Sequence, residues 1–259
     1  MALFLLCPNL GWIQGQFNFT ELSLRYPIGF TDPRYVGDPI NAMRIFNEKE
    51  VDELILLDID ASRLGRGPDY DQIQDIVSEA FMPIAYGGGV TTVEQAQHLV
   101  SLGVEKVVVN TAVLQDFNLV HKMADHLGSS STVVAVDVKR DWLGRYRVFC
   151  SATGKEINRD LVEHIKQAVT AGAGEIFVND VVRDGTGKGY DLELVRRVTS
   201  GVDVPVIVCG GASTPEHLRE TVAAGASAVA AGSMFVYEGK HRAVMINYPK
   251  REILQKIIK

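Results

Sequence analysis

The amino-acid sequence predicts an α/β protein of the (β/α)8 barrel class, and three observations support this prediction. Short runs of aliphatic or β-branched residues recur along the chain, and each is followed by a Gly- or Asp-containing loop and an amphipathic stretch of about helix length. The runs are continuously apolar rather than alternating, which is typical of parallel strands covered by helices. A doubly wound open sheet would show the same order of elements, but the third observation, an internal repeat, favours the barrel.

Eight apolar runs are the expected strands. The first, residues 1–7, lacks a basic leader and is too short for a signal segment or a membrane span, so we interpret it as a buried strand. The other seven runs occupy residues 54–57, 83–86, 107–109, 133–136, 176–178, 204–208 and 228–231. Eight βα units in 259 residues match the usual barrel size of about 250 residues.

The second half of the sequence repeats the first at an offset of 122 residues. This offset places Asp58 on Asp180, and the register continues through loops and helices without a gap. Further matching pairs are Glu53 with Glu175, Gly65 with Gly187, Gly67 with Gly189, Asp69 with Asp191, Pro83 with Pro205, Gly88 with Gly210, Gly89 with Gly211, Thr92 with Thr214, Glu94 with Glu216 and Gly103 with Gly225. The alternative is that any two βα units share Gly, Pro and Val, but such sharing rarely keeps register over this length. We therefore expect one domain, residues 1–259, built from two half-barrels of about residues 1–122 and 123–245.

Composition and charge exclude several classes of protein. The chain has 26 basic and 32 acidic residues, a formal net charge of −6, so we expect no nucleic-acid partner and no membrane association. Its three cysteines, Cys7, Cys150 and Cys209, are an odd number without a CxxC pair, which indicates a reducing compartment and a cytoplasmic location. None of the six histidines has metal-ligand spacing, so we expect no metal and no cofactor.

Glycine-rich loops follow two of the expected strands at corresponding places. Residues 87–89 and 210–211 each precede the start of a helix, where backbone N–H groups and the helix dipole favour an anion. A second loop follows in each half, at residues 110–111 and 232–233. Each half thus offers two loops for one phosphate, and we expect a long ligand with a phosphate at each end. The alternative is a set of tight turns without a ligand.

Carboxylates at strand ends are the candidates for acid–base chemistry. Asp137 directly follows an apolar strand, where its side chain would reach the active-site end of a barrel and act as a general acid or base. Asp184 lies on a Gly-rich loop, where it either positions a ligand or makes an Asx-turn. Asp58 ends another strand and is expected to be a buried partner rather than a catalytic residue.

Charged residues also mark the opposite end of the expected barrel. Glu53, Lys106 and Glu175 each begin an apolar strand, so they should converge there. Buried charges require partners, and a cluster of mixed sign satisfies this need. A purely structural set of salt bridges is the alternative to a functional role.

Several motifs resemble one known family. They are residues 85–89 (AYGGG), 109–112 (VNTA), 136–140 (VDVKR), 183–186 (RDGT) and 209–212 (CGGA). Together they are similar to HisF, the cyclase subunit of imidazole glycerol phosphate synthase, over about residues 36–236. The resemblance implies a (β/α)8 (TIM) barrel that receives ammonia from a HisH-type glutaminase through the barrel interior. It also implies that the ammonia reacts with a bis-phosphorylated ribonucleotide of histidine biosynthesis, giving imidazole glycerol phosphate and an aminoimidazole carboxamide ribotide.

The resemblance also implies roles for individual residues. Asp137 would be a catalytic aspartate. Phosphate-binding positions would be Gly89, Asn110 and Thr111 in the first half and Asp184, Gly185, Gly211, Gly232 and Ser233 in the second. The charged gate through which ammonia enters would include Glu53, Lys106 and Glu175.

The start of the chain departs from the HisF pattern. Where HisF has its other catalytic Asp, this sequence has either Asn9 or no corresponding residue, and an amide cannot exchange a proton as a carboxylic acid can. The arginine that completes the family's gate is missing from residues 1–6, Gln14 stands where the family has a loop lysine, and residues 16–34 match poorly.

These departures keep other functions open. They suit HisF-like proteins of surface-polysaccharide gene clusters, which with a HisH-like protein resemble an ammonia supply for a separate sugar amidotransferase. A non-catalytic scaffold that activates the glutaminase is another alternative. A HisA-like bis-phosphate sugar isomerase is a third, although the charges at Glu53, Lys106 and Glu175 favour HisF.

Overall fold

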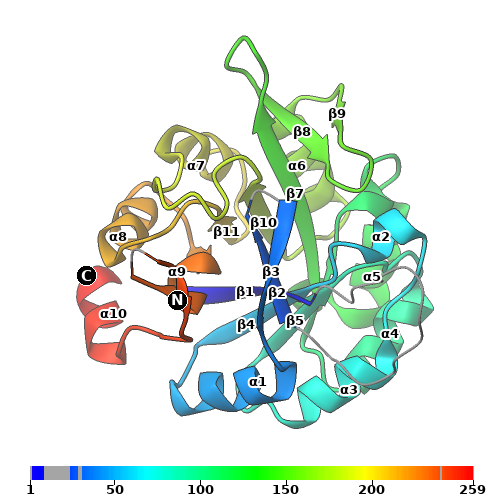
Figure 1. The fold of residues 1–259 in the computed structure, drawn as a ribbon. Helices are drawn as coiled ribbons and strands as arrows, with labels where there is room; N and C mark the ends of the chain where they lie inside the picture. Colours follow the sequence, from blue (N-terminus) through cyan, green and yellow to red (C-terminus); the bar gives the residue numbers. More distant parts are fainter. Residues whose placement is uncertain (1, 9–23, 29–30, 240, 259) are drawn as a thin grey trace.

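The computed structural model describes residues 2–8, 24–28, 31–239 and 241–258 of the chain. Within these residues, eight parallel strands form a ring with helices around it (Figure 1). In ring order they are β1 (Ala2–Pro8), β4 (Glu53–Leu57), β5 (Ile84–Gly87), β6 (Lys106–Val109), β7 (Thr132–Arg140), β10 (Glu175–Asp180), β11 (Val206–Cys209) and β12 (Ala228–Ala231). The pairing of β10 with β7 and of β12 with β1 closes the ring, so the predicted (β/α)8 barrel is confirmed.

Because the ring strands are parallel, all their carboxyl ends lie at one end of the barrel, here called the mouth, and their amino ends at the other, the base. The surrounding helices are α1 (Pro39–Glu48), α3 (Tyr70–Ser78), α4 (Val93–Ser101), α5 (Asn118–Leu127), α6 (Leu161–Thr170), α7 (Leu192–Thr199), α8 (Pro215–Ala223) and α10 (Arg251–Ile258), with short α2 (Ala61–Leu64) and α9 (Ser233–Val236). Among the described residues, no helix has the length and apolar character needed to cross a membrane.

Side-chain caps explain where most of these helices begin. A cap of this kind contributes about 1 kcal/mol because it satisfies a backbone N–H that has no partner inside the helix. The capping residues, each accepting a backbone N–H from the first turn, are Asp38, Asp69, Thr92, Asp160, Asp191 and Thr214.

Alternating side chains of the ring strands fill two apolar clusters. In β4, Leu54 and Leu56 pack outward against the helices, whereas Ile55 points into the ring. Phe177 of β10 lies in the same interior cluster and is 1% exposed. Burial on both faces is the reason that these strands are continuously apolar in sequence.

The chain leaves the ring after β7. Instead of ending near residue 136, β7 continues to Arg140 and turns back as β8 (Tyr146–Cys150), which pairs with β9 (Lys155–Ile157). This arm, visible as the long green hairpin in Figure 1, was not predicted, because the apolar run ends at a charged residue while the strand itself goes on. A second unpredicted hairpin, β2 (Leu24–Ile28) and β3 (Thr31–Gly37), extends from β1, and β13 (Tyr237–Glu238) pairs with β14 (Ala243–Val244).

Residues related by the 122-residue offset make matching turns. The carboxylate of Asp58 accepts the N–H groups of the residues two and three positions later, and Asp180 does the same. Gly89 and Gly211 both have positive φ, +67° and +104°. These turns agree with the repeat seen in the sequence, and the division into two half-barrels stays a prediction.

Candidate active site

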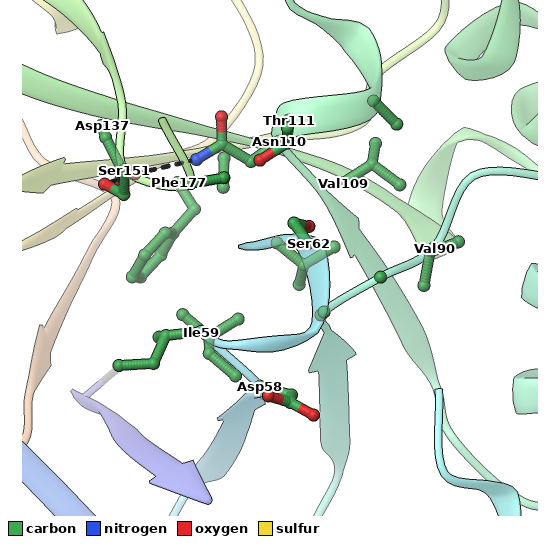
Figure 2. Close-up of a pocket in the computed structure, with 18 of the residues that line it drawn as sticks. Asp58, Ile59, Ser62, Val90, Val109, Asn110, Thr111, Asp137, Ser151 and Phe177 are labelled. Carbon is green, nitrogen blue, oxygen red and sulfur yellow. Dashed lines mark hydrogen bonds between the residues drawn. The ribbon is translucent and has the colours of Figure 1, made fainter. Parts of the chain in front are cut away.

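A pocket opens at the mouth of the barrel. It is lined by the loops that follow β4, β5 and β6 and by residues of β7, β10 and the arm. Figure 2 shows Asp58 and Asp137 on opposite sides of this pocket, with Ser62 and Asn110 also on its wall. The pocket therefore combines the first glycine-rich loop with the predicted catalytic carboxylate.

Asp137 is held by three side-chain donors. Its Oδ2 accepts from Ser151 Oγ at 2.5 Å and Asn110 Nδ2 at 3.1 Å, and its Oδ1 accepts from Asn179 Nδ2 at 3.3 Å. The residue is 7% exposed. Burial raises the pKa of Asp137 above its ordinary value, and the hydrogen bonds from Ser151, Asn179 and Asn110 oppose this rise. A carboxylate in this environment is suited to exchange a proton with a ligand.

The first glycine-rich loop contributes Gly87, Gly88 and Gly89 to the pocket wall. A Cβ atom on Gly89 would lie 2.2 Å from the backbone oxygen of Arg66, so only glycine lets the loop pack there. Thr111, which begins a 3-10 turn (Thr111–Val113) after β6, lines the same pocket. The predicted residues of the first phosphate site are thus brought together, although the side chain of Asn110 points to Asp137.

The second glycine-rich loop lies across the mouth from the first. It follows β11, and in ring order β11 is opposite β5, just as β12 is opposite β6. A Cβ on Gly211 would lie 2.3 Å from the backbone oxygen of Gly189, which repeats the packing seen at Gly89. Gly232 directly precedes α9, which begins at Ser233, at the end of β12, and Asp184, 3% exposed, follows β10 with Gly185.

Asp58 and Asp180 have structural roles at the mouth. Asp58 is 4% exposed, accepts two backbone N–H groups and forms a 3.1 Å ion pair with Arg66. Burial raises the pKa of Asp58, and Arg66 opposes the rise. The expectation that Asp58 is a buried partner is confirmed by these contacts. The Asx-type turn on the loop after β10 is made by Asp180, which accepts the N–H groups of Val182 and Arg183.

The base of the barrel carries the predicted charged cluster. Lys106 Nζ lies 3.0 Å from Glu53 Oε1 and 2.8 Å from Glu175 Oε1. Glu53 is 1% exposed, and burial raises its pKa although Lys106 opposes the rise. Burial acts to lower the pKa of Lys106, but its hydrogen bonds to Glu175 and Glu53 outweigh this and raise it.

Comparisons with known proteins identify the family. A family model described as histidine biosynthesis protein matches residues 20–242. The "putative imidazole glycerol phosphate synthase subunit hisF2" of Pseudomonas aeruginosa is 52% identical over 86% of this chain and 89% of its own length. A putative HisF of Leptospira interrogans is 46% identical over 87% and 89%, and the HisF of Exiguobacterium sibiricum is 39% identical over 80% and 83%. The chain belongs to the HisF family.

Two positions considered for this HisF-family chain lie outside the described residues. One is Asn9, the expected counterpart of the other catalytic Asp of HisF, and Gln14 is the other. Among the described residues, no group of three or more His, Cys, Asp or Glu side chains could hold a metal.

Sequence reasoning missed two residues of the HisF-family pocket, Ser151 and Asn179. The alternation of β10 was a usable signal for Asn179: Glu175 and Phe177 face the barrel interior, so the residue two positions later also does. Ser151 lies just after β8, on the arm, and no sequence pattern predicted the arm.

Proposed function

We propose that this chain is a synthase subunit of the imidazole glycerol phosphate synthase type, a cyclase and lyase that receives ammonia from a HisH-type glutaminase. The observation that carries this proposal is the buried carboxylate of Asp137, held by three donors in one pocket with a glycine-rich loop. The ammonia reacts at the mouth with a bis-phosphorylated sugar or nucleotide. Family membership supports the choice of reaction.

The two ends of the ligand bind at opposite sides of the mouth. One phosphate is held by Gly89, Asn110 and Thr111, and the other by Asp184, Gly185, Gly211, Gly232 and Ser233. Backbone N–H groups at the start of α4 and α8, and at α9, favour anions at these loops. The site lies within one domain of two half-barrels, residues 1–122 and 123–245.

Asp137 acts as general acid and base between the two phosphates. Its raised pKa brings the carboxyl closer to neutral pH, where it exchanges protons more effectively than an exposed Asp. The base of the barrel is where the glutaminase docks to form a heterodimer, and Lys106, Glu53 and Glu175 form part of the gate for ammonia. The free thiols of Cys150 and Cys209 suit a reducing, cytoplasmic location.

A second function is favoured by Asn9. With an amide in place of the other catalytic Asp, cyclisation by two carboxylates is impaired, and the chain instead supplies ammonia to a separate sugar amidotransferase of surface-polysaccharide synthesis.

One experiment separates these functions. The full chain is mixed with a HisH-type glutaminase, and co-elution, glutamine hydrolysis and consumption of the bis-phosphorylated ribonucleotide with ammonium salts are measured. The synthase consumes the ribonucleotide with ammonium alone. A sugar-amidation subunit and a non-catalytic scaffold would both raise glutamine hydrolysis without consuming the ribonucleotide. Of these two, only the sugar-amidation subunit would support amidine formation when a sugar amidotransferase is added. Absence of co-elution, together with isomerisation of a bis-phosphate sugar, would indicate a HisA-like enzyme.

A further inference from the structure

Asn179 makes the one side-chain hydrogen bond that the described residues provide to Oδ1 of Asp137. Oδ2 already accepts from Ser151 and Asn110. A carboxylate has about four lone-pair positions, two on each oxygen. Oδ2 is therefore saturated, and Oδ1 keeps a lone pair for a proton or donor of the ligand.

The backbone fixes this contact. Asn179 and Asp137 are direct partners across the pairing of β10 with β7, which closes the barrel. Asn179 is 1% exposed and lines the pocket. Its amide group therefore reaches Oδ1 from the neighbouring strand of the barrel wall, and both residues line the pocket.

The carbonyl oxygens of Asn179 and Asn110 provide an independent observation. Both are buried, and neither has a hydrogen-bond partner among the described residues. Buried polar atoms are nearly always paired, and an unpaired one at a pocket is explained by a ligand that pairs with it. Two acceptor oxygens beside Asp137 are suited to a ligand group that carries N–H or O–H donors.

We propose that Asn179 is a positioning residue for Asp137: its N–H group orients Oδ1 toward the reacting proton of the ligand, and its carbonyl oxygen accepts a second N–H or O–H of the same ligand. This rests on the proposed role of Asp137 as acid and base. The other charged residue on the pocket wall is Asp58, which pairs with Arg66.

The sequence offers a matched substitution. Leu57, 122 residues earlier, ends β4 and lines the same pocket, so the barrel already accommodates leucine at the corresponding place. Asn179→Leu keeps the number and branching of the side-chain heavy atoms and removes both the donor and the acceptor. Asn179→Ser replaces the amide donor with a hydroxyl donor and serves as the second variant. Asn47→Leu is the control, because the Asn47 amide donates to the backbone oxygen of Glu79 at 2.7 Å, away from the pocket.

The first measurement needs no activity. The carboxyl carbon of Asp137 is followed by ¹³C NMR during a pH titration of the full chain and is assigned by its loss in Asp137→Asn. We expect a higher midpoint in Asn179→Leu, an intermediate one in Asn179→Ser and no change in Asn47→Leu. An unchanged midpoint in a folded Asn179→Leu protein overturns the proposal.

The second measurement uses ammonium-dependent turnover. We expect Asn179→Leu to lower kcat about tenfold with little change in KM, because one hydrogen bond to the reacting group is lost. In an Asp137→Asn background the same substitution should have no further effect on kcat, since Asn179 acts through Asp137. Equal losses in both backgrounds overturn the proposal. If the unmodified protein shows no turnover, the proposed synthase function fails, and the NMR titration still decides the role of Asn179.

Discussion

The substitution Lys106→Met tests whether the buried carboxylates at the base of the barrel depend on Lys106 for their stability. Lys106 is the cation that pairs with both Glu53 and Glu175, and its side chain is 16% exposed. The substitution keeps most of the length of the side chain and removes the charge. Glu53, whose side chain is 2% exposed, is then left as a buried carboxylate without its cation.

The expected loss of stability is about 3 kcal/mol near pH 7, the usual cost of removing one partner from a buried ion pair. The loss depends on pH. In the intact protein the pKa of Glu53 is already raised above its ordinary value of 4.5, and loss of Lys106 raises it further. Because the folded variant then binds this proton more tightly than the folded unmodified protein does, its deficit grows as pH rises through the raised pKa of Glu53 and shrinks as pH falls below it.

Urea unfolding followed by circular dichroism measures this loss. The control is the double variant Lys106→Met with Glu53→Gln, which removes the unpaired charge and should recover part of the lost free energy. A single-variant loss below about 1 kcal/mol at neutral pH, or a loss that does not change with pH, would refute the argument that Lys106 is needed to keep Glu53 buried and charged.

Three further predictions follow from single residues. Asp137→Asn should lower ammonium-dependent turnover about hundredfold or more while the urea midpoint stays close to that of the unmodified protein; a loss under about tenfold would argue against acid–base catalysis by this residue. Gly89→Ala should cost about 1–3 kcal/mol in urea unfolding and weaken binding of inorganic phosphate, because φ is +67° and the new Cβ meets a backbone oxygen; unchanged stability would contradict this. Trp142→Ser, at a position 90% exposed on the arm, should leave the unfolding free energy within about 0.5 kcal/mol, and a larger loss would show packing that the structure lacks.

The strands of the barrel could be predicted because burial on both faces leaves a direct mark on the sequence. Residues 54–57 and 176–178 are apolar at every position, and both lie within ring strands. The arm could not be predicted in this way. After Asp137, the strand buries Val138 but exposes Arg140, and its stability comes from pairing with β8, a partner that is not evident from local composition.

Only part of the candidate site could be predicted from the sequence. The loops were found because glycines are required by close backbone approach, as at Gly89. Asp137 was found because a charge at the end of an apolar run is conspicuous. Ser151 and Asn179 have neither feature in the sequence. Their place in the site is evident only from their hydrogen bonds to Asp137 in the folded protein.

The 122-residue offset relates positions at which the two halves of the sequence agree and positions at which they differ. Pairs that agree, such as Asp58 with Asp180, make backbone turns that any half-barrel needs. Two pairs that disagree lie inside the barrel: Leu57, near the mouth, corresponds to Asn179, and Lys106, at the base, corresponds to Ala228. A duplicated scaffold can tolerate such differences because they replace side chains without altering the turns. It follows that the differing inward-facing pairs, more than the matching glycines, are where substitutions should change the reaction rather than the fold.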